Sequence, residues 1–313
     1  MDNVIVLLGP TASGKTRISI ELATQINGEI ISADSMQVYK YMDIGTAKPD
    51  ADERRGIKHY LVDEVTPDEE FSVARYKEIA SGYIRQIIRN GKIPVVAGGT
   101  GLYISSLIDN IEFSDTICDW ELRKRLQKEA EEKGNAYLHS KLMQIDPSAA
   151  EKIHMNNVKR VIRAIEVYTH TNKPISRHQE ESRKNPPEYS FIVFGLTMDR
   201  DKLYERINKR VDLMLEKGLV GEVENLIKLG YDIRTVAMQA IGYKEILAYL
   251  AGEISYDEAV YIIKRDTRHY AKRQMTWFKR MENVIWMNVD DVDDEQEIIK
   301  NMKYHIATSG IFL

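Results

Sequence analysis

The stretch Gly9-Pro10-Thr11-Ala12-Ser13-Gly14-Lys15-Thr16 decides the fold, because it fits the phosphate-loop pattern G-x-x-x-x-G-K-[ST]. The apolar residues 4–8 before it predict a buried parallel strand, and residues 17–26 after it predict a helix. A turn between such a strand and helix directs backbone N–H groups and the positive helix end at one anion. We expect Lys15 to reach terminal phosphate oxygens and the Thr16 hydroxyl to face a Mg²⁺ ion. The flanking elements argue against a chance match, so the chain is predicted to bind a di- or triphosphate.

The composition is that of an ordinary globular protein. The 313 residues are 43% hydrophobic and 29% charged, and they suffice for one large or two smaller domains. The single cysteine, Cys118, excludes an internal disulfide and a zinc site of several thiolates, and the seven histidines show no metal-ligand spacing. No apolar run approaches the roughly 20 residues of a membrane span, and the short N-terminal run does not resemble a signal peptide. We therefore expect a cytoplasmic protein with no membrane partner, and a net charge of −4 does not by itself indicate nucleic acid.

Strands and helices alternate over the first part of the chain. Short apolar runs at residues 29–32, 60–62 and 93–97 predict strands, and residues 72–90 predict a helix that ends at Gly91. Such alternation favours a parallel sheet covered on both faces. Ligands of these folds bind at the carboxyl ends of the strands.

The pattern changes after residue 113. Residues 114–185 are charged and strand-free, with helices expected at 120–133, 137–145 and 149–169, and they end in the linker Asn185-Pro186-Pro187. Strands are expected again at 191–196 and 284–287, with helices between them, and the acidic run at 290–297 is interpreted as a solvated turn and helix start. We therefore predict an α/β fold: a P-loop NTPase-like parallel sheet flanked by helices, with an inserted all-helical domain. Residues 1–113 and 189–313 would form the P-loop catalytic core, and residues 114–188 the insertion.

Polar residues at the expected strand ends are candidates for chemistry. Asp34 follows the strand at 29–32, where a carboxylate can hold Mg²⁺ through water or act as a general base; a loop-capping aspartate is the alternative. Thr100, in Ala97-Gly98-Gly99-Thr100-Gly101, would present its hydroxyl to the same crevice, or would cap the following helix. The polar residues that follow Asp34 closely, and that are suited to contact a ligand, are Ser35, Gln37 and Tyr39.

Two common classes of phosphate-loop protein do not fit. The strand at 93–97 lacks the terminal acid that motor ATPases place there. The stretch Asn172-Lys173-Pro174-Ile175 lacks the aspartate of the N-K-x-D motif with which GTPases bind their base. The motor and G-protein interpretations are both weakened.

Basic residues cluster on predicted helices. A helix that starts after Ser255, with Ser255 and Glu258 as a capping box, is apolar on one face and almost purely basic on another. The basic residues are Lys264, Arg265, Arg268, Lys272 and Lys279, with Arg273 and Arg280 at the margin, and a second group is Lys152, Lys159, Arg160 and Arg163. Basic faces are often only solvated, but two of them on a chain of negative net charge favour phosphate binding.

Two arginines lie one turn apart on the helix predicted at about 202–217. Either Arg206 or Arg210 could supply a cationic clamp on a leaving phosphate. Either could equally pair with a surface carboxylate, and the pattern alone does not choose between them.

Together, the motifs resemble the tRNA dimethylallyltransferases, also called isopentenyltransferases, in their bacterial form. The resemblance runs in the family's order from residue 9 to about 280, which makes it far more specific than the phosphate loop alone. Beyond that loop, the matching blocks are Ser32-Ala33-Asp34-Ser35-Met36-Gln37-Val38-Tyr39, Met42-Asp43-Ile44-Gly45-Thr46-Ala47-Lys48-Pro49, Gly98-Gly99-Thr100-Gly101-Leu102-Tyr103, Asn157-Val158-Lys159-Arg160-Val161-Ile162-Arg163-Ala164, Gln239-Ala240-Ile241-Gly242-Tyr243-Lys244 and Ala271-Lys272-Arg273-Gln274-Met275-Thr276-Trp277.

The resemblance implies a prenyl transfer to RNA. A dimethylallyl group would pass from dimethylallyl diphosphate to N6 of adenosine 37, beside the anticodon, in tRNAs reading codons that begin with U. It implies dependence on Mg²⁺ and an insertion that closes around the anticodon stem-loop. We expect a monomer, and whether ATP also occupies the loop stays open because the pattern recognises only phosphates.

The resemblance also assigns roles to residues. Lys15, Mg²⁺ near Thr16 and Arg210 would stabilise charge on the leaving diphosphate, Asp34 would be the base, and Thr100 would orient the amine or the diphosphate. The adenine must be flipped out of its stack to reach the site, where Ser35, Met36 and Gln37 would contact it. Residues that would track the RNA backbone are Arg123, Lys159, Arg160, Val161, Ile162, Arg163 and the basic helix face.

Two departures and two rival functions remain. Some bacterial members of the family carry arginine in the block where this chain has Met238, Gln239 and Ala240. Some eukaryotic relatives add a zinc finger, and this chain has no cysteines that could form one. A small-molecule kinase of the shikimate or nucleoside type would share the loop and Asp34 but would not need the basic helix. A non-catalytic RNA-binding protein would bind tRNA and modify no base.

Overall fold

The computed structural model describes residues 2–113, 118–182, 184–290 and 295–309. The chain divides into two compact units, residues 1–104 with 189–313 and residues 105–188, which we call the sheet unit and the helical unit. The expected domain boundary at residue 114 falls on residues 114–117, which lie outside the described residues. The same holds for residues 291–294 of the acidic run.

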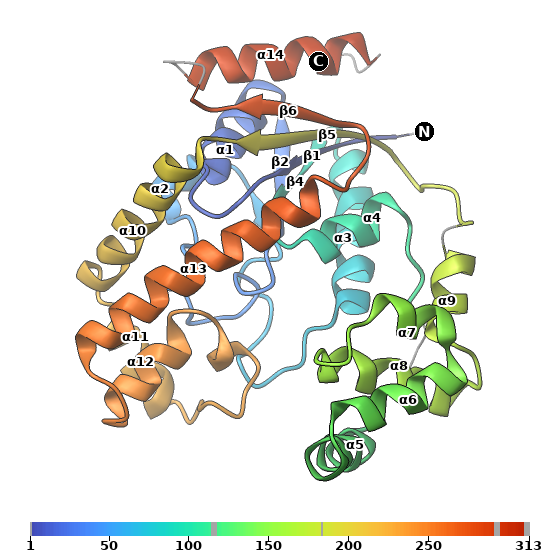
Figure 1. Ribbon diagram of the computed structural model, residues 1–313. Helices are drawn as coiled ribbons and strands as arrows, with labels where there is room; N and C mark the ends of the chain where they lie inside the picture. Colours follow the sequence, from blue (N-terminus) through green and yellow to red (C-terminus); the bar gives the residue numbers. More distant parts are fainter. Residues whose placement is uncertain (1, 114–117, 183, 291–294, 310–313) are drawn as a thin grey trace. The chain divides into compact units, whose positions relative to one another are not determined.

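The described part of the sheet unit is built on six parallel strands in the order β3-β2-β4-β1-β5-β6 (Figure 1). The strands are β1 (Asn3–Leu8), β2 (Gly28–Ala33), β3 (His59–Tyr60), β4 (Ile93–Gly98), β5 (Ser190–Thr197) and β6 (Val284–Asn288). The predicted α/β fold, a P-loop sheet flanked by helices, is confirmed, and every predicted strand overlaps an observed one. The third strand is shorter than predicted because Leu61 turns the chain with a φ of 59°.

The helices of the sheet unit fall into two groups along the chain, one before β5 and one after it. Those of the first part are α1 (Lys15–Gln25), α2 (Ala51–Arg54), α3 (Val73–Arg89) and α4 (Gly101–Ile108), which runs into the helical unit. Those after β5 are α10 (Arg200–Glu216), α11 (Leu219–Lys228), the 3₁₀ turn η1 (Ala237–Gln239), α12 (Tyr243–Leu250), α13 (Tyr256–Phe278) and α14 (Glu295–Thr308). Ser255 caps α13 by accepting a bond from the Glu258 N–H, as half of the predicted capping box requires.

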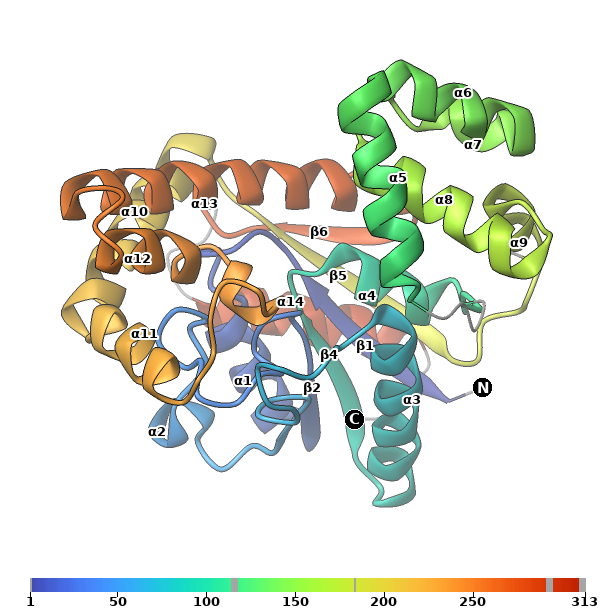
Figure 2. The same cartoon turned by 90° about the horizontal axis from the view of Figure 1, so that it is seen from below.

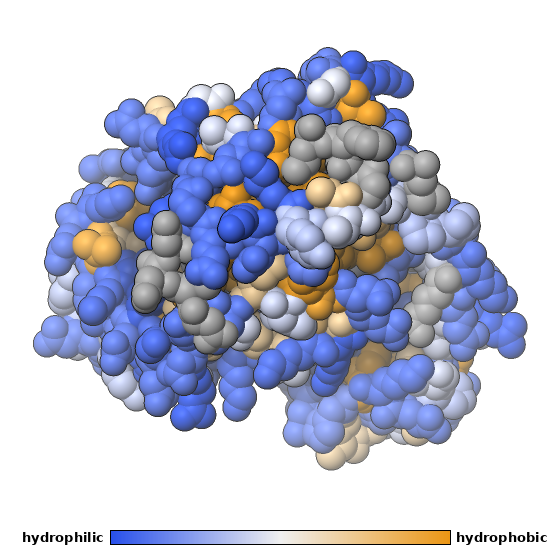
Figure 3. All heavy atoms as spheres, turned by 90° about the horizontal axis from the view of Figure 1, so that it is seen from above, coloured by the Kyte–Doolittle hydropathy of each residue, from blue (hydrophilic) through white to orange (hydrophobic). Residues whose placement is uncertain are grey.

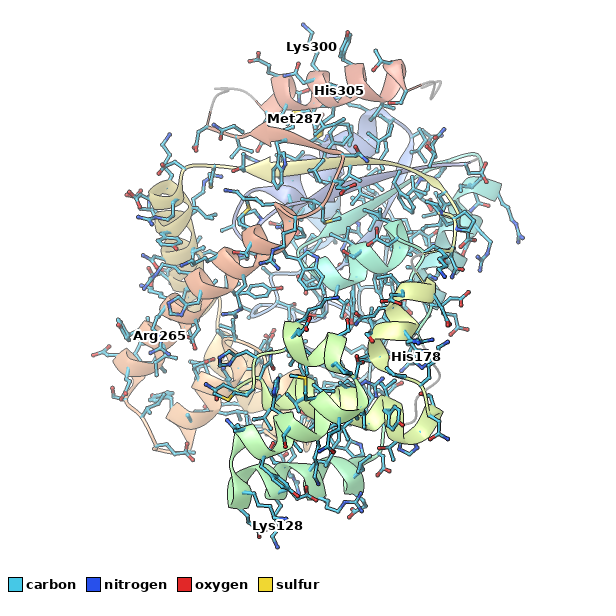
Figure 4. All side chains as sticks on the ribbon, turned by 45° about the vertical axis from the view of Figure 1, so that its right-hand side comes forward. Lys128, His178, Arg265, Met287, Lys300 and His305 are labelled. Carbon is cyan, nitrogen blue, oxygen red and sulfur yellow. The ribbon has the colours of Figure 1, made fainter. Side chains whose placement is uncertain are left out.

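One face of the sheet is covered by α1 and α14 (Figure 1). Ile5 and Leu7 of β1 pack there with Leu22 of α1 and Met302 of α14, all buried. Figure 4 labels Met287 and His305 at this layer, where the His305 ring lies 6.4 Å from that of Phe194. This face therefore forms an apolar core of the sheet unit.

The opposite face is covered by α3, which packs against β2 and β4 (Figure 2). Side chains alternate along a strand, so the buried Val4, Val6 and Leu8 of β1 point to this side. Helix α3 begins where Ser72 accepts a bond from the Arg75 N–H, and it ends before Gly91, which has a φ of 69°. The helix predicted at 72–90 is therefore confirmed with its cap residues.

The helical unit has its own core. Its helices after α4 are α5 (Trp120–Lys133), α6 (Asn135–Ile145), α7 (Pro147–Lys152), α8 (Val158–Thr171) and α9 (Ile175–Ser182). Buried residues of four of them pack together, including Leu122, Leu142, Ala149, Val161 and Ile165. This cluster supplies the apolar area that an independent helical unit needs.

The helix predicted at 149–169 is wrong as a single element, because the structure divides it into α7 and α8. The imidazole Nε2 of His139 bonds the carbonyl oxygens of both Ala150 and Ile153, at 3.1 and 2.9 Å. These bonds satisfy carbonyl oxygens at the end of α7 that have no partner within a helix. The periodicity of the sequence predicts a helix across residues 153–157, but these residues lie between α7 and α8.

A buried carboxylate, that of Glu166, binds two arginines of the helical unit. Glu166 of α8 is fully buried and accepts bonds from Arg123 Nε and Nη2, at 2.8 and 2.9 Å, and from Arg163 and the Asp119 N–H. Burial opposes the charge, but the bonds from Arg123 and Arg163 hold the pKa of Glu166 below its usual range. A charge so placed must stay paired, since an unpaired buried ion is costly.

The face in Figure 3 is mostly hydrophilic, and its apolar residues form scattered patches. None of the described helices combines the length and apolar character needed to cross a membrane. Even α13, with 23 residues, carries Lys264, Arg265, Asp266 and Arg268 in a single stretch.

We predict that Leu142→Ala destabilises the protein by about 2–5 kcal/mol, since Leu142 is fully buried and its removal leaves a cavity in the core of the helical unit. Urea unfolding of the full chain, followed by circular dichroism, measures this loss. The control is Met143→Ala on the same helix, where the side chain is 42% exposed and should lose much less. Equal losses for the two variants would contradict the assigned core.

Candidate active site

The phosphate loop joins β1 to α1 as its pattern predicts. Gly14 has a φ of 91°, which disfavours any side chain, and α1 begins at the next residue. A Cβ on Gly9 would lie 3.0 Å from the Leu196 carbonyl oxygen, so this glycine lets the loop pass close to β5. The Pro10 carbonyl accepts bonds from Ser13 Oγ at 2.8 Å and from Lys15 Nζ at 2.6 Å. Lys15 is thus folded onto its own loop, within reach of an anion that would replace Pro10 as its partner.

Two partly buried cations stand beside this loop. Burial, helped by the nearby charge of Arg210, lowers the pKa of Lys15 to about 7, and Asp34 acts in the opposite direction. Burial also lowers the pKa of Arg210, against the charges of Asp34 and Glu53. No hydrogen bond or ion pair is recorded for the Arg210 guanidinium among the described residues. An anion bound here would therefore stabilise two cations that the protein itself leaves poorly compensated.

Asp34 lies where β2 ends, as predicted. Its Oδ1 accepts bonds from the backbone N–H groups of Met36, at 2.9 Å, and Gln37, at 3.3 Å. The loop-capping alternative therefore describes one oxygen of the carboxylate. Within the described residues no bond is recorded for Oδ2, so one oxygen fixes the side chain and the other can take a proton.

Thr100 ties the ends of two strands together. Its Oγ1 accepts a bond from the Ser35 N–H at 3.0 Å, and its own N–H donates to the Ala33 carbonyl at 3.0 Å. The threonine hydroxyl is thus directed to the residue that follows Asp34. Thr100 holds Asp34 and its neighbours in place at the sheet edge.

Gln274 and Tyr270 of α13 complete the site, and the sequence analysis did not select either of them. Gln274 is buried; its Oε1 accepts a bond from the Thr11 N–H at 2.8 Å, and its Nε2 donates to the Gly99 carbonyl at 2.9 Å. It links the phosphate loop to the end of β4. Burial raises the pKa of Tyr270 well above its usual range, with a further contribution from the charge of Asp34. The sequence contained one signal for Gln274: it is a polar residue on the apolar helix face that also carries Ala271 and Phe278.

Three neighbouring cavities of the sheet unit meet at Arg210. The smallest, about 90 Å³, is lined by Lys15, Thr16, Asp34, Gln274 and Arg210, so phosphate loop and carboxylate face one space. A second cavity of about 270 Å³ also reaches Asp34 and is mostly apolar, lined by residues that include Ile207, Val211, Met214, Leu219, Ile241 and Ile263. A third cavity, of about 750 Å³, is lined by residues 14–17 of the phosphate loop and α1, by part of residues 43–55, and by α10.

The structure distinguishes the two candidate arginines. Arg210 lines all three cavities, whereas Arg206 is exposed and lines the largest of them. Both come from α10, one turn apart. Arg210 is therefore the one placed to contact a group held between the loop and Asp34.

A metal ion is tested against the donors at this site. In the part of the chain that the structure describes, no group of three His, Cys, Asp or Glu side chains is gathered for a metal. Thr16 is exposed and shares the 90 Å³ cavity with Asp34. Such a sparse set of oxygen donors fits Mg²⁺, which takes most of its ligands from substrate phosphates and water.

The basic face of α13 divides into two halves. In the first half, labelled by Arg265 in Figure 4, Lys264 pairs with Asp212, Arg265 with Asp266, and Arg268 bonds Asn208. In the second half, Arg273 is exposed and its guanidinium lies 5.8 Å from the centre of the Tyr270 ring. The exposed residues without an ion pair or hydrogen bond in the described regions are Lys272, Arg273, Lys279 and Arg280. The capacity to bind phosphates lies mainly in this second half.

The candidates of the helical unit differ in exposure. Lys159 and Arg160 are exposed at the start of α8, while Val161 and Ile162 are buried in the core, so their side chains are not available to RNA in this structure. Arg123 and Arg163 are held by Glu166, and the Arg123 guanidinium lies 5.1 Å from the centre of the Trp120 ring.

Comparisons with known proteins identify the family of the chain. A family model described as IPP transferase matches residues 37–281. The chain is 74% identical over 313 residues to the tRNA dimethylallyltransferase of Acetivibrio thermocellus, with 100% of each chain covered. The tRNA isopentenylpyrophosphate transferase structure from Bacillus halodurans is 42% identical, with a TM-score of 0.74 over 98% of this chain and 96% of that chain. A eukaryotic dimethylallyltransferase structure, described as acting on tRNA, is 31% identical, with a TM-score of 0.82 over 98% and 80%.

We predict that the affinity for inorganic diphosphate falls about tenfold more steeply between pH 6 and pH 8 in the natural chain than in Lys15→Arg. An anion binds the ammonium form, and in the empty loop the pKa of Lys15 is about 7, so the bound form must recruit a proton above that pH. The arginine of the variant stays charged at both pH values. The ionisation of diphosphate itself affects both proteins equally, so the variant serves as the control for it. Calorimetric titrations at both pH values test this, and parallel slopes would refute it.

Proposed function

The chain belongs to the IPP transferase family, and on this basis we propose that it transfers a dimethylallyl group from dimethylallyl diphosphate to N6 of adenosine 37 in tRNA. The tRNAs are those reading codons that begin with U, and diphosphate is released. The observation that supports this most directly is the 90 Å³ cavity, where Lys15 and Thr16 of the phosphate loop face Asp34. Both halves of a prenyl transfer can meet there.

The phosphate loop is assigned to the donor's diphosphate. The allylic C–O bond breaks, its electron pair stays on the diphosphate oxygen, and negative charge grows there. Lys15, Arg210 and the N–H groups at the start of α1 are placed to stabilise that charge, and they do so most strongly where water is excluded. Mg²⁺ near Thr16, when bound, would neutralise part of the same charge.

Asp34 is assigned to the acceptor. The exocyclic amine of adenine is a weak nucleophile that becomes acidic only as the new C–N bond forms, and the free oxygen Oδ2 would then take the proton. The bonds from Met36 and Gln37 to Oδ1 keep the carboxylate oriented during this step. The apolar 270 Å³ cavity, which adjoins both Asp34 and Arg210, is suited to the isoprenoid chain.

The acceptor base must leave its stack to reach Asp34, because a stacked adenine cannot enter the cavity that Asp34 lines. We assign the exposed Lys159 and Arg160, and Arg123 and Arg163 held by Glu166, to the anticodon stem-loop. The second half of the α13 basic face, at Lys272 and Lys279, would contact phosphates of the same RNA. A monomer in the cytoplasm is sufficient for this function.

The kinase alternative shares the phosphate loop and Asp34, but the comparisons do not favour it. A kinase would form ADP from ATP in the presence of a small metabolite. The proposed enzyme forms none, and instead labels tRNA from radiolabelled dimethylallyl diphosphate. The two activities are therefore separable in one pair of assays.

We predict that Asp34→Asn reduces turnover by about 10²–10⁴-fold, since the amide keeps an acceptor for the turn but cannot take a proton. Binding of tRNA should stay within about twofold of the natural chain. The product is measured by mass spectrometry of digested tRNA, and the binding by filter retention. The control is Asp68→Asn, at an exposed carboxylate outside the cavities. Full turnover in Asp34→Asn would exclude the assigned base.

We predict that Arg210→Gln lowers kcat by about 10²–10³-fold, because it removes a cation from the leaving diphosphate. Arg206→Gln, one turn away on the same helix and exposed, should change kcat less than about threefold. Single-turnover rates with dimethylallyl diphosphate measure both. An equal effect of the two substitutions would show that the clamp is not localised at Arg210.

A further inference from the structure

The loop of residues 42–49, which we call the partition loop, separates two cavities of the sheet unit. Gly45 and Thr46 line the apolar cavity of about 270 Å³. Asp43, Ile44, Ala47 and Lys48 line the larger cavity of about 750 Å³. A single stretch of backbone therefore forms a wall with one cavity on each side.

Glu222 of α11 holds the middle of this wall. Its Oε2 accepts bonds from the backbone N–H groups of Asp43, at 2.8 Å, and Ile44, at 2.7 Å, and its Oε1 accepts one from Gly45 at 3.1 Å. Tyr243 Oη donates a fourth bond to Oε1 at 2.6 Å. Bonds within the loop reach the carbonyl oxygens of Asp43 and Ile44, whereas the N–H groups of residues 43–45 donate to the Glu222 carboxylate.

The Tyr243 ring packs against the partition loop on the side of the apolar cavity. A Cβ on Gly45 would lie 2.5 Å from the Tyr243 ring, so the loop approaches the ring as closely as a glycine allows. The ring is fully buried and lines the apolar cavity. Burial, with the neighbouring charge of Glu222, raises the pKa of Tyr243 well above its usual range, so its hydroxyl remains a donor.

The remainder of the loop is fixed from the sheet edge. Gln37 Nε2 donates to the carbonyl oxygens of Thr46 and Ala47, both at 3.3 Å, and its Oε1 accepts a bond from Ser32 Oγ at 2.9 Å. Lys48 Nζ donates to the Tyr39 carbonyl at 2.6 Å and pairs with two carboxylates. Glu222, supported by Tyr243, adds the bonds that fix the backbone N–H groups of residues 43–45.

Building on the function proposed above, we propose that Glu222 and Tyr243 are positioning residues that limit the prenyl donor to a five-carbon chain by holding the partition loop. The isoprenoid lies in the apolar cavity, and the wall formed by Gly45 and Thr46 stops a longer chain. Loosening the loop would open the apolar cavity toward the larger one, and the extra carbons could then be buried instead of clashing.

The test compares two donors, dimethylallyl diphosphate and the longer geranyl diphosphate, with the full chain and a tRNA anticodon stem-loop. Glu222→Gln leaves one acceptor oxygen and places an NH₂ group against N–H donors, so the loop is released. The expected result is a rise of about tenfold or more in kcat/KM for geranyl relative to dimethylallyl diphosphate. Glu224→Gln, exposed on the same helix, should keep the natural ratio.

Tyr243→Phe is the second variant, because it removes one bond and leaves the ring packed against Gly45. It should shift the donor ratio in the same direction by a smaller factor, and it decides the question alone if Glu222→Gln does not fold. A merely structural role lowers the rate for both donors equally. An unchanged ratio in the folded variants therefore overturns the inference, whatever happens to the overall rate.

The natural chain is assayed first, which separates two failures. If it transfers neither donor to the RNA, the proposed function is wrong and the inference falls with it. If it transfers dimethylallyl and the variants keep the natural donor ratio, the function stands and only the role of the partition loop is rejected.

Discussion

The site depends on how closely the ends of β2 and β4 approach each other. Gly98 pairs with Ala33 in the sheet, and a Cβ on Gly98 would lie 2.2 Å from the Ala33 carbonyl oxygen. Only a glycine permits this approach, and it brings Thr100 to within 3.0 Å of the Ser35 N–H. Asp34 is then carried beside the phosphate loop by the sheet itself, without a flexible loop between them. A parallel sheet achieves this because all its carboxyl ends share one edge.

The electrostatics of the site support the proposal that it binds a diphosphate. Lys15 and Arg210 share one small space with a single carboxylate, and burial disfavours the charge on both cations. A bound diphosphate reverses that balance, and the reversal is strongest when charge grows on the leaving oxygens. Interactions that strengthen in the transition state raise kcat, whereas those made equally with the bound donor do not. The arrangement therefore suits a reaction in which the diphosphate leaves intact.

The sequence predicted those parts of the site that rest on local pattern. The phosphate loop, the strands beside it and Asp34 at a strand end follow from spacing and periodicity, and the resemblance to tRNA dimethylallyltransferases is confirmed by the comparisons. Gln274 was not predicted, because its two bonds reach Thr11 and Gly99, which are far away in the chain. The break between α7 and α8 was also not predicted; the carbonyls at the end of α7 bond His139 of α6, a contact that helical periodicity does not encode.

The block Met42-Asp43-Ile44-Gly45-Thr46-Ala47-Lys48-Pro49 shows why a motif need not mark chemistry. It was matched to the family by its letters, but its side chains mostly hold the loop: Lys48 is nearly inaccessible and pairs with Asp43 and Asp63, and Thr46 bonds the Met42 carbonyl. Gly45 is explained by the Tyr243 ring. What the block offers a ligand is the shape of its backbone. A wall of backbone excludes by volume and is insensitive to the chemistry of what it meets, which suits discrimination between prenyl chains that differ only in length.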